Sequence, residues 1–287
     1  MVLKTMNFDF YVLFFIFWKG NDKMKKILCL FLIVIFCFSG TNLIIYSSFN
    51  ITLDPGHGAN ASGAQAFYDG KLINEKDLNL KIGLFIREEL SKYKTARNGK
   101  VNVYLTRYND GSNPSLSDRV NIAKNNRSSV LVSLHCNARP HPDKPLRGAM
   151  VLVTSSNYHN LYSKEEKLAR LILQELNNIG IPCTQNICSS EVVKFNKRLL
   201  KPKFELKEGI LRRLSNTGYH YPNGDYGDYY GIVRHGTLKS IPTVLIEHCH
   251  IDFEDDYRRF LSSDDKLREL AKADVRAIAR CYNLKIK

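Results

Sequence analysis

Short apolar runs alternate with amphipathic helical patterns along most of this chain, and this alternation constrains the fold more than any other feature. Strands are expected where β-branched and apolar residues follow one another, at 51–53, 101–106, 130–134, 149–153 and 243–246. Helical periodicity separates them, over 75–90, 115–125, about 163–180 and 264–282. The order is typical of an α/β fold. We therefore predict one domain of three layers, in which helices cover both faces of a mostly parallel, twisted sheet.

Three of the expected helices carry start signals in the sequence. Asn74 can cap the helix over 75–90, and Ser115 follows a proline at the start of the second helix. Ser163 and Glu166 have the spacing of a capping box ahead of the third helix.

The first 46 residues have the composition of a targeting segment. Two lysines after Met24 precede an unbroken apolar run over 27–38, followed by Ser-Gly, which is the pattern of a secretory signal peptide. Apolarity resumes at 43–46, so the same segment is also long enough to stay as an N-terminal membrane anchor. Both interpretations remain open. Each predicts an exported protein of the cell envelope, periplasmic or extracellular, whose translation starts at Met24.

The chain is strongly basic, with 42 Lys and Arg against 28 Asp and Glu and a net charge of +14. Removing residues 1–46 leaves 37 basic and 26 acidic residues, so the charge belongs to the remaining domain. Such a surface attracts anionic polymers. Nucleic acid is not the expected partner, because the chain has no RNP motif, zinc finger or Arg-rich block. An exported protein meets wall and lipid anions instead.

The cysteine pattern excludes a disulfide framework and a thiolate metal site. Two of the seven cysteines lie in the leader, so an odd five remain, and none forms a CxxC pair. A disulfide between Cys183 and Cys188 is one option, whereas the others lie in apolar contexts that favour buried thiols: Cys136, Cys249 and Cys281. Any metal must therefore be held by histidines and carboxylates.

Residues 181–229 do not continue the strand and helix alternation. They contain a Lys-rich stretch near 194–207 and a turn-rich stretch over 216–225, and we predict a loop-rich insertion. Long irregular insertions in compact domains often form functional rims. We expect this one beside the active site, where it either regulates or binds substrate.

Residues capable of metal binding follow three of the expected strands. His57 follows the first, His135 ends another, and Glu247 ends the strand at 243–246. Glu75 opens the first helix, so its carboxylate can point to the same sheet edge, where open parallel sheets bind ligands. His57, Glu75 and His135 would make a three-ligand Zn²⁺ set with a position left for water.

Glu247 is the candidate for proton transfer, because a hydrolase needs a group that takes a proton from water and returns it to the leaving amine. Each of these residues alone is more simply explained as a structural or surface group. The hypothesis of a hydrolytic zinc site therefore depends on their occurring together. Strand alternation places His248 and His250 opposite Glu247, where packing or support of the site is expected.

Several ordered motifs resemble the zinc-dependent N-acetylmuramoyl-L-alanine amidases of the Amidase_3 type. They are the Leu-Asp-Pro-Gly-His-Gly run at 53–58, Asn-Glu-Lys at 74–76, Leu-Thr-Arg at 105–107, Ser-Leu-His-Cys-Asn at 133–137, and the stretches 229–234 and 241–248. The resemblance implies one Zn²⁺ bound by His57, Glu75 and His135, with Glu247 catalytic. It implies hydrolysis of the amide between N-acetylmuramic acid and L-alanine in peptidoglycan.

The same resemblance nominates four substrate contacts, Asn137, Arg107, Arg119 and Arg234. Pairing with acids beneath the sheet edge is the alternative for Arg107 and Arg119.

The chain departs from the family pattern after Glu247, where His250 and Phe253 occupy positions that are commonly Phe and Asn. The insertion at 181–229 has no counterpart that we can align. Two other functions therefore remain open. One is a zinc hydrolase of the same fold that cleaves another amide or peptide bond of the wall, and the other is a non-catalytic wall-binding or regulatory module. We expect a monomer in each case.

Overall fold

The protein is described by a computed structural model that covers residues 22–23, 48–139, 147–184, 187–188, 192–195, 199–202, 204–215 and 217–287. The chain divides into two compact units, 1–45 and 46–287, and the fold below is that of the second. Apart from the helical residues 22 and 23, the predicted leader over 1–46 lies outside the described residues. Within the described residues, we find no helix with both the length and the apolarity to cross a bilayer.

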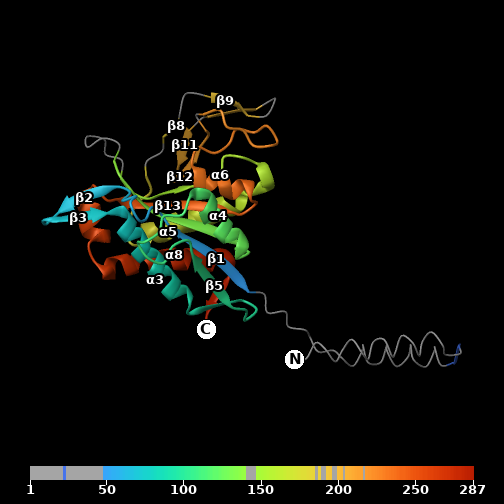
Figure 1. Ribbon diagram of the computed structural model, residues 1–287, viewed down its shortest axis with the longest axis horizontal. Coiled ribbons are helices and arrows are strands. Elements are labelled where there is room, and N and C mark those ends of the chain that lie inside the picture. The colour runs from blue at the N-terminus through green and yellow to red at the C-terminus, as the bar shows by residue number, and fades with distance from the viewer. Residues whose placement is uncertain are drawn as a thin grey trace. The chain divides into compact units, whose positions relative to one another are not determined.

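An eight-stranded mixed sheet lies at the centre of this unit (Figure 1). Its strand order is β5-β1-β6-β13-β7-β12-β11-β8. The strands of this sheet are β1 (Phe49–Pro55), β5 (Val101–Leu105), β6 (Val130–Asn137), β7 (Met150–Leu152), β8 (Ile187–Cys188), β11 (Phe204–Lys207), β12 (Ile210–Arg213) and β13 (Thr243–His250). Smaller two-stranded sheets pair β2 (Gln65–Tyr68) with β3 (Lys71–Asn74), β9 (Val192–Phe195) with β10 (Leu199–Pro202), and β4 (Tyr93–Thr95) with β14 (Leu284–Ile286).

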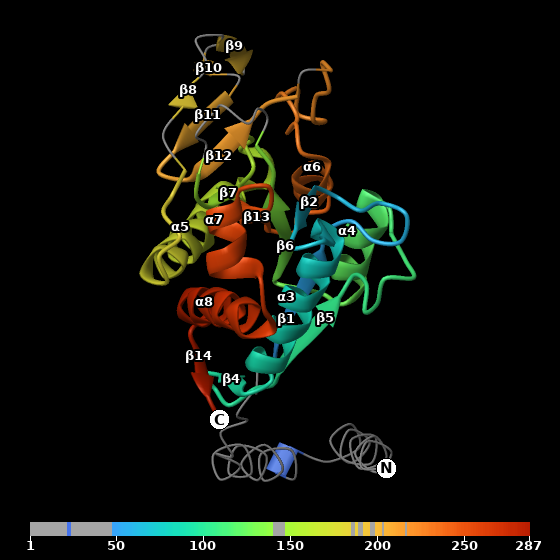
Figure 2. The same cartoon turned by 90° about the vertical axis from the view of Figure 1, so that its left-hand side faces the viewer.

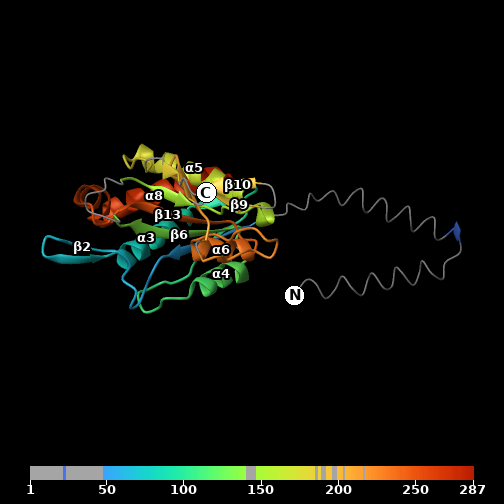
Figure 3. The ribbon, with the colours of Figure 1, turned by 90° about the horizontal axis from the view of Figure 1, so that it is seen from above.

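Helices cover both faces of the sheet, as predicted (Figure 3). One face carries α3 (Glu75–Leu90), α5 (Tyr162–Asn178) and α8 (Asp264–Tyr282). The other carries α4 (Leu116–Asn125) and α6 (Gly231–Leu238). A short connection before α8 holds α7 (Glu254–Asp256) and a π-helical turn (Tyr257–Leu261), and a 3₁₀ turn (Tyr158–Asn160) precedes α5. The three-layer α/β prediction is therefore confirmed.

Side-chain alternation along the central strands explains the two layers. In β6, Val132 and Leu134 join the apolar core under α3 and α8, whereas Leu131 joins the core under α4 and α6. β13 alternates in the same way, with Val244 on the first side and Leu245 on the second. Burial on both faces is what a parallel, helix-covered strand requires, and it fixes the register.

The parallel register brings the carboxyl ends of β1, β6 and β13 to one edge. Asp54 of β1 is paired with Ser133 of β6, and His135 of β6 is paired with Glu247 of β13. The predicted convergence of strand ends therefore follows from strand pairing alone.

The predicted loop-rich character of residues 181–229 is wrong in part. β11, β12 and β8 extend the main sheet, and β9 pairs with β10 (Figure 2). Glu208 and Gly209 join β11 to β12 with positive φ angles of 50° and 78°, the conformation of a tight hairpin turn. The sheet has four parallel and three antiparallel pairings. β5, β1, β6 and β13 are parallel from one edge of the sheet to its middle, and β7 is parallel to β12.

Two local predictions also differ from the structure. Helix α5 starts at Tyr162 with Leu161 at the N-cap and no side-chain cap, so Ser163 and Glu166 form no capping box; Glu166 pairs with Arg170 instead. Cys183 is a free thiol, so the disulfide considered for Cys183 and Cys188 is absent. The prediction for Ser115 is confirmed, because its hydroxyl accepts from the Asp118 backbone N–H at 3.2 Å.

A buried carboxyl joins α5 to the sheet. Glu165 accepts hydrogen bonds from the backbone N–H groups of Thr154 at 2.8 Å and Thr243 at 2.9 Å. Burial raises the pKa of the Glu165 carboxyl to about 8, although both hydrogen bonds oppose the shift.

The folded protein should therefore lose stability as the pH rises towards 8. Between the ordinary carboxyl pKa and about 8, folded Glu165 keeps a proton that the unfolded chain has lost, so unfolding releases a proton in this window. We expect this group to contribute a slope of up to about 1.4 kcal/mol per pH unit, which Glu165→Gln removes. Urea denaturation at a series of pH values measures this slope. If the stability of wild type and of Glu165→Gln changed with pH in the same way, the raised pKa of Glu165 would be contradicted.

Candidate metal centre and catalytic carboxylate

His57, Glu75 and His135 meet at the carboxyl edge of the sheet. Nε2 of His57 lies 3.0 Å from Oε2 of Glu75, and Nδ1 of His135 lies 2.8 Å from Oε1. The two imidazole rings are 4.9 Å apart and nearly perpendicular. Each residue offers a ligand atom within 4.8 Å of the other two, and no other trio of His, Cys, Asp or Glu in the described residues does so. The three predicted ligands therefore form one cluster.

Glu75 is held in place by donors from three segments of the chain. Oε2 accepts from the backbone N–H of Ala64 at 2.8 Å, and Oε1 accepts from that of Cys136 at 3.1 Å. The side chain of Asn79, one helical turn further along α3, donates to Oε1 at 3.1 Å. Burial by itself raises the pKa of the Glu75 carboxyl, but the bonds with both histidines outweigh it and hold the pKa well below its ordinary value.

Two glycines give the ligand side chains their space. A Cβ at Gly56 would lie 2.2 Å from the His135 ring, and one at Gly63 would lie 2.4 Å from Oε2 of Glu75. His57 itself has a positive φ of 61°, which is uncommon for a residue with a side chain. The loop after β1 therefore has a backbone conformation that places the His57 ring against Glu75.

Arg119 of α4 fixes the start of this loop. Its guanidinium pairs with Oδ1 of Asp54 at 2.6 Å and donates to the backbone carbonyl of His57 at 2.8 Å. The side chains of Arg119 and Asp54 are only 3% and 2% exposed. Thr106 and Ser133 donate to the same carboxylate at 2.6 and 2.7 Å, so Asp54 joins β1, β6, α4 and the end of β5.

Arg107 fixes the same loop from the other side. Its guanidinium donates to the carbonyl oxygens of Pro55 at 3.0 Å, Gly56 at 3.0 Å and Lys76 at 2.7 Å. These acceptors are backbone groups, not the acids considered from the sequence. Arg107 therefore connects the His57 loop to the first turn of α3, which carries Glu75.

Glu247 faces the cluster from β13, as the register with His135 requires. Its Oε2 atom is buried and has no hydrogen-bond partner among the described residues. Burial and the neighbouring charge of Glu75 raise the pKa of the Glu247 carboxyl well above its ordinary value. A buried carboxyl without a partner is costly in a folded protein, and it is typical of a group that acts on a ligand.

A cavity of about 370 Å³ opens beside the cluster on the α4 and α6 side of the sheet. His57 and His135 of the cluster line it, together with Ser133 and Leu245 of the sheet. The loop into α4 and the first residues of α6 form its walls, among them Leu116, Tyr230, Gly231 and Ile232.

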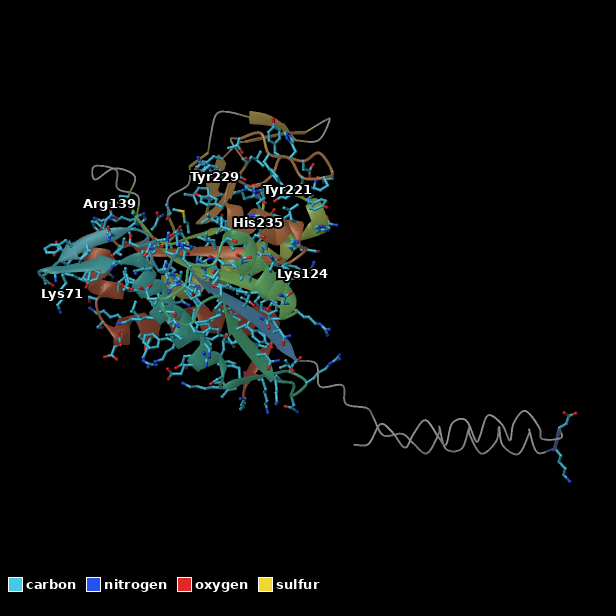
Figure 4. All side chains as sticks on the ribbon, viewed as in Figure 1. Lys71, Lys124, Arg139, Tyr221, Tyr229 and His235 are labelled. Carbon is cyan, nitrogen blue, oxygen red and sulfur yellow. The ribbon has the colours of Figure 1, made fainter. Side chains whose placement is uncertain are left out.

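Part of the α6 wall belongs to the stretch 229–234, which resembles the family and from which Arg234 was nominated as a substrate contact. The lining residues themselves, Tyr230, Gly231 and Ile232, were not predicted. They are the N-cap and the first two residues of α6, a region that Figure 4 marks by Tyr229 and His235.

Two of the nominated substrate contacts, Asn137 and Arg234, are not part of the cluster. Asn137 is half-buried at the end of β6, two residues after His135, and its amide contacts the Met150 sulfur at 3.9 Å. Arg234 lies one turn into α6, where it donates to the Asp228 carbonyl at 2.9 Å and sits over the Tyr219 ring. Neither side chain is among the residues that line the cavity.

The sequence profile of the N-acetylmuramoyl-L-alanine amidase family, Amidase_3, matches residues 51–280. Over 88 residues the chain is 39% identical to the N-acetylmuramoyl-L-alanine amidase AmiC of Escherichia coli. This aligned stretch is 31% of the present chain and 19% of AmiC, so the chain spans about a fifth of that curated relative.

Solved structures share the fold. The N-acetylmuramoyl-L-alanine amidase from Clostridium difficile 630 superposes with a TM-score of 0.57 at 20% identity, over 81% of this chain and 96% of that one. AmiC2 of Nostoc punctiforme gives a TM-score of 0.54 at 24% identity, with the same coverage of 81% and 96%. Because the family profile covers most of the chain, from the first strand to the last helix, this protein belongs to the N-acetylmuramoyl-L-alanine amidase family.

Proposed function

We propose that this protein hydrolyses the amide between N-acetylmuramic acid and L-alanine in bacterial peptidoglycan, with one Zn²⁺ bound by His57, Glu75 and His135. Family membership supports the reaction. The observation that carries the proposal is a cluster of two imidazoles and one carboxylate that faces Glu247, whose buried Oε2 has no hydrogen-bond partner among the described residues.

The donor set fits zinc. Two imidazole nitrogens and one carboxylate oxygen are a common catalytic zinc set, and such sites keep a position open. The glycines at 56 and 63 leave the rings and the carboxylate uncrowded, and the bonds to Glu75 from Ala64 and Cys136 orient that ligand. Zn²⁺ bound there supplies Lewis acidity for the amide carbonyl and for water.

Glu247 is the proposed proton carrier. A carboxylate beside the cluster accepts a proton from the attacking water and returns it to the nitrogen of the departing L-alanine. Burial favours the protonated form of Glu247, so the group holds its proton readily once it has accepted it. The absence of a partner on Oε2, within the described residues, leaves that atom available for the transfer.

The cavity beside the cluster is the proposed place for the muramoyl peptide. Of the four nominated substrate contacts, Asn137 and Arg234 remain proposals for substrate binding. The contacts of Arg107 and Arg119 support a different role, because their guanidinium groups are already bonded to Asp54 and to the carbonyls of the His57 loop. Both are proposed to hold that loop in place.

Sequence and family together support a location in the cell envelope and an anionic polymer as substrate. A net charge of +14 suits a polymer that carries carboxylates and lies among wall anions. We propose an exported, monomeric enzyme of the cell envelope, which residues 1–46 either target for secretion or anchor in the membrane.

Two other functions stay in competition with this one. A hydrolase of the same fold that cuts another wall amide would use the same residues. A wall-binding module without activity has no use for a buried carboxyl oxygen that lacks a partner, within the described part of the chain, beside three potential metal ligands. This geometry favours an enzyme.

Replacing the proton carrier tests the enzyme against the binding module. Glu247→Gln should lower turnover by roughly 10²- to 10⁴-fold, the usual contribution of general acid–base catalysis, while zinc content and binding to sacculi stay unchanged. Glu254→Gln, on the exposed α7 turn, is the matched control. Mass spectrometry of digested sacculi measures the release of peptides that begin with L-alanine. Equal release by wild type and Glu247→Gln would exclude the proposed mechanism, and stem-internal fragments would indicate another bond.

Metal removal tests the cofactor. Chelator should abolish peptide release, and one equivalent of Zn²⁺ should restore it. Zn²⁺ at about 100 times its dissociation constant should stabilise the fold by about 2.7 kcal/mol, seen as a rise in Tm. His135→Ala should remove that rise, and His220→Ala, an exposed histidine of the insertion, should keep it. A stoichiometry other than one ion, or an unchanged rise in His135→Ala, would refute the site.

The two arginine roles can be separated by stability. Arg119→Met leaves Asp54 buried without its cation, which should cost about 3–5 kcal/mol of unfolding free energy. Arg234→Met, at the surface of α6, should change KM without a comparable loss. Chemical denaturation and steady-state kinetics measure both. A stable Arg119→Met variant with only a raised KM would restore Arg119 as a substrate clamp.

A further inference from the structure

His248, the residue after Glu247, forms a buried bridge between three elements. Its Nδ1 lies 2.9 Å from the backbone carbonyl oxygen of His135, on β6. Its Nε2 lies 2.9 Å from Oδ2 of Asp274, on α8. Both side chains are 0% exposed. One ring therefore contacts the backbone of a metal ligand, is covalently next to Glu247, and is held from behind by the last helix.

The contact with β6 sets the direction of one hydrogen bond. A carbonyl oxygen can only accept, so Nδ1 of His248 donates to the backbone oxygen of His135. On the other side of the ring, Nε2 lies against the Asp274 carboxyl group. The His248 ring therefore links α8 to the β6 backbone.

The bridge lies at an irregularity in the β6–β13 pairing. Glu247 is in register with His135, but the next pair joins His250 to Asn137, so β13 has one extra residue between them. Such a bulge re-aims the side chains around it and interrupts regular pairing. At this bulge the His248 side chain donates to the β6 carbonyl, which ties the bulged strand to its partner.

Packing alone does not account for this pair. Apolar side chains of similar size often replace a buried ion pair without loss of stability, so stability is weak grounds for burying one. What the pair adds is a directed bond to the residue that carries a metal-ligating ring. Outer hydrogen-bond partners of this kind commonly orient metal ligands.

We propose that His248 and Asp274 are positioning residues of the metal centre. They hold the His135 backbone and the β13 bulge so that the His135 ring and the Glu247 carboxyl keep their mutual placement. This inference rests on the proposed function for its catalytic readout, whereas its metal-binding readout stands independently.

The test separates position from stability. The double variant H248L/D274L removes the bridge without leaving a buried charge unpaired, so the fold should survive. D274N keeps a hydrogen-bonding partner for the ring and with it the bond to His135. Glu175→Gln is the matched control, because it weakens another link to α8, through Arg276 and Arg280, far from the ligands.

We expect H248L/D274L to bind Zn²⁺ at least about tenfold more weakly in isothermal titration calorimetry, since loss of an outer partner commonly costs 10- to 100-fold. Its kcat for muramoyl-peptide hydrolysis should fall by a similar factor, with KM within about twofold. D274N and Glu175→Gln should stay close to wild type in both measurements. Circular dichroism confirms that each variant is folded at the assay temperature.

Three results would overturn the proposal: wild-type affinity and kcat in H248L/D274L, an equal loss in Glu175→Gln, or a loss in D274N as large as in the double variant. If the double variant does not fold, H248L replaces it, because it also removes the donor to the His135 carbonyl and should weaken Zn²⁺ binding by about tenfold. Wild-type affinity in a folded H248L variant would overturn the proposal. Wild-type protein that binds Zn²⁺ but releases no peptide beginning with L-alanine would refute the proposed function and leave the affinity comparison valid.

Discussion

The arrangement of the site depends on one carboxylate. Glu75 accepts from the backbone after the first loop, from the backbone of β6 and from its own helix, and it faces an imidazole on each oxygen. Burying a carboxylate is costly unless donors surround it, and here the donors come from segments that are far apart in sequence. Satisfying that one group therefore forces the loop after β1, the start of α3 and the end of β6 into a single geometry.

Around this carboxylate, two arginines hold the backbone of the loop after β1. Arg107 and Arg119 donate to the carbonyl oxygens of residues 55–57, and Arg119 also pairs with Asp54. A loop that carries a proposed metal ligand would otherwise be among the more mobile parts of a fold. Hydrogen bonds to the carbonyls of this loop keep the backbone of His57 in place and leave its ring free to bind the proposed metal ion.

Much of this could be predicted from sequence, because parallel strands that alternate with helices bring their carboxyl ends together. Helices on both faces of the sheet and the meeting of His57, Glu75 and His135 follow from that rule, whereas the strand order was not predicted. The strands of the insertion were missed because they are only two to four residues long, which is too short for an alternating pattern to be recognised. The backbone acceptors of Arg107 were missed because any residue type supplies a carbonyl. Asp274 was missed because only tertiary packing brings it to His248.

The order of the chain has a consequence for biogenesis. The proposed ligands and Glu247 are all present once residue 247 has been made, yet α8 begins only at Asp264. This helix packs on α3 and α5 and contacts His248 through Asp274. A nascent polypeptide therefore carries the side chains of the candidate site before it carries the helix that supports them, and we expect the site to reach its final geometry only after α8 has been synthesised.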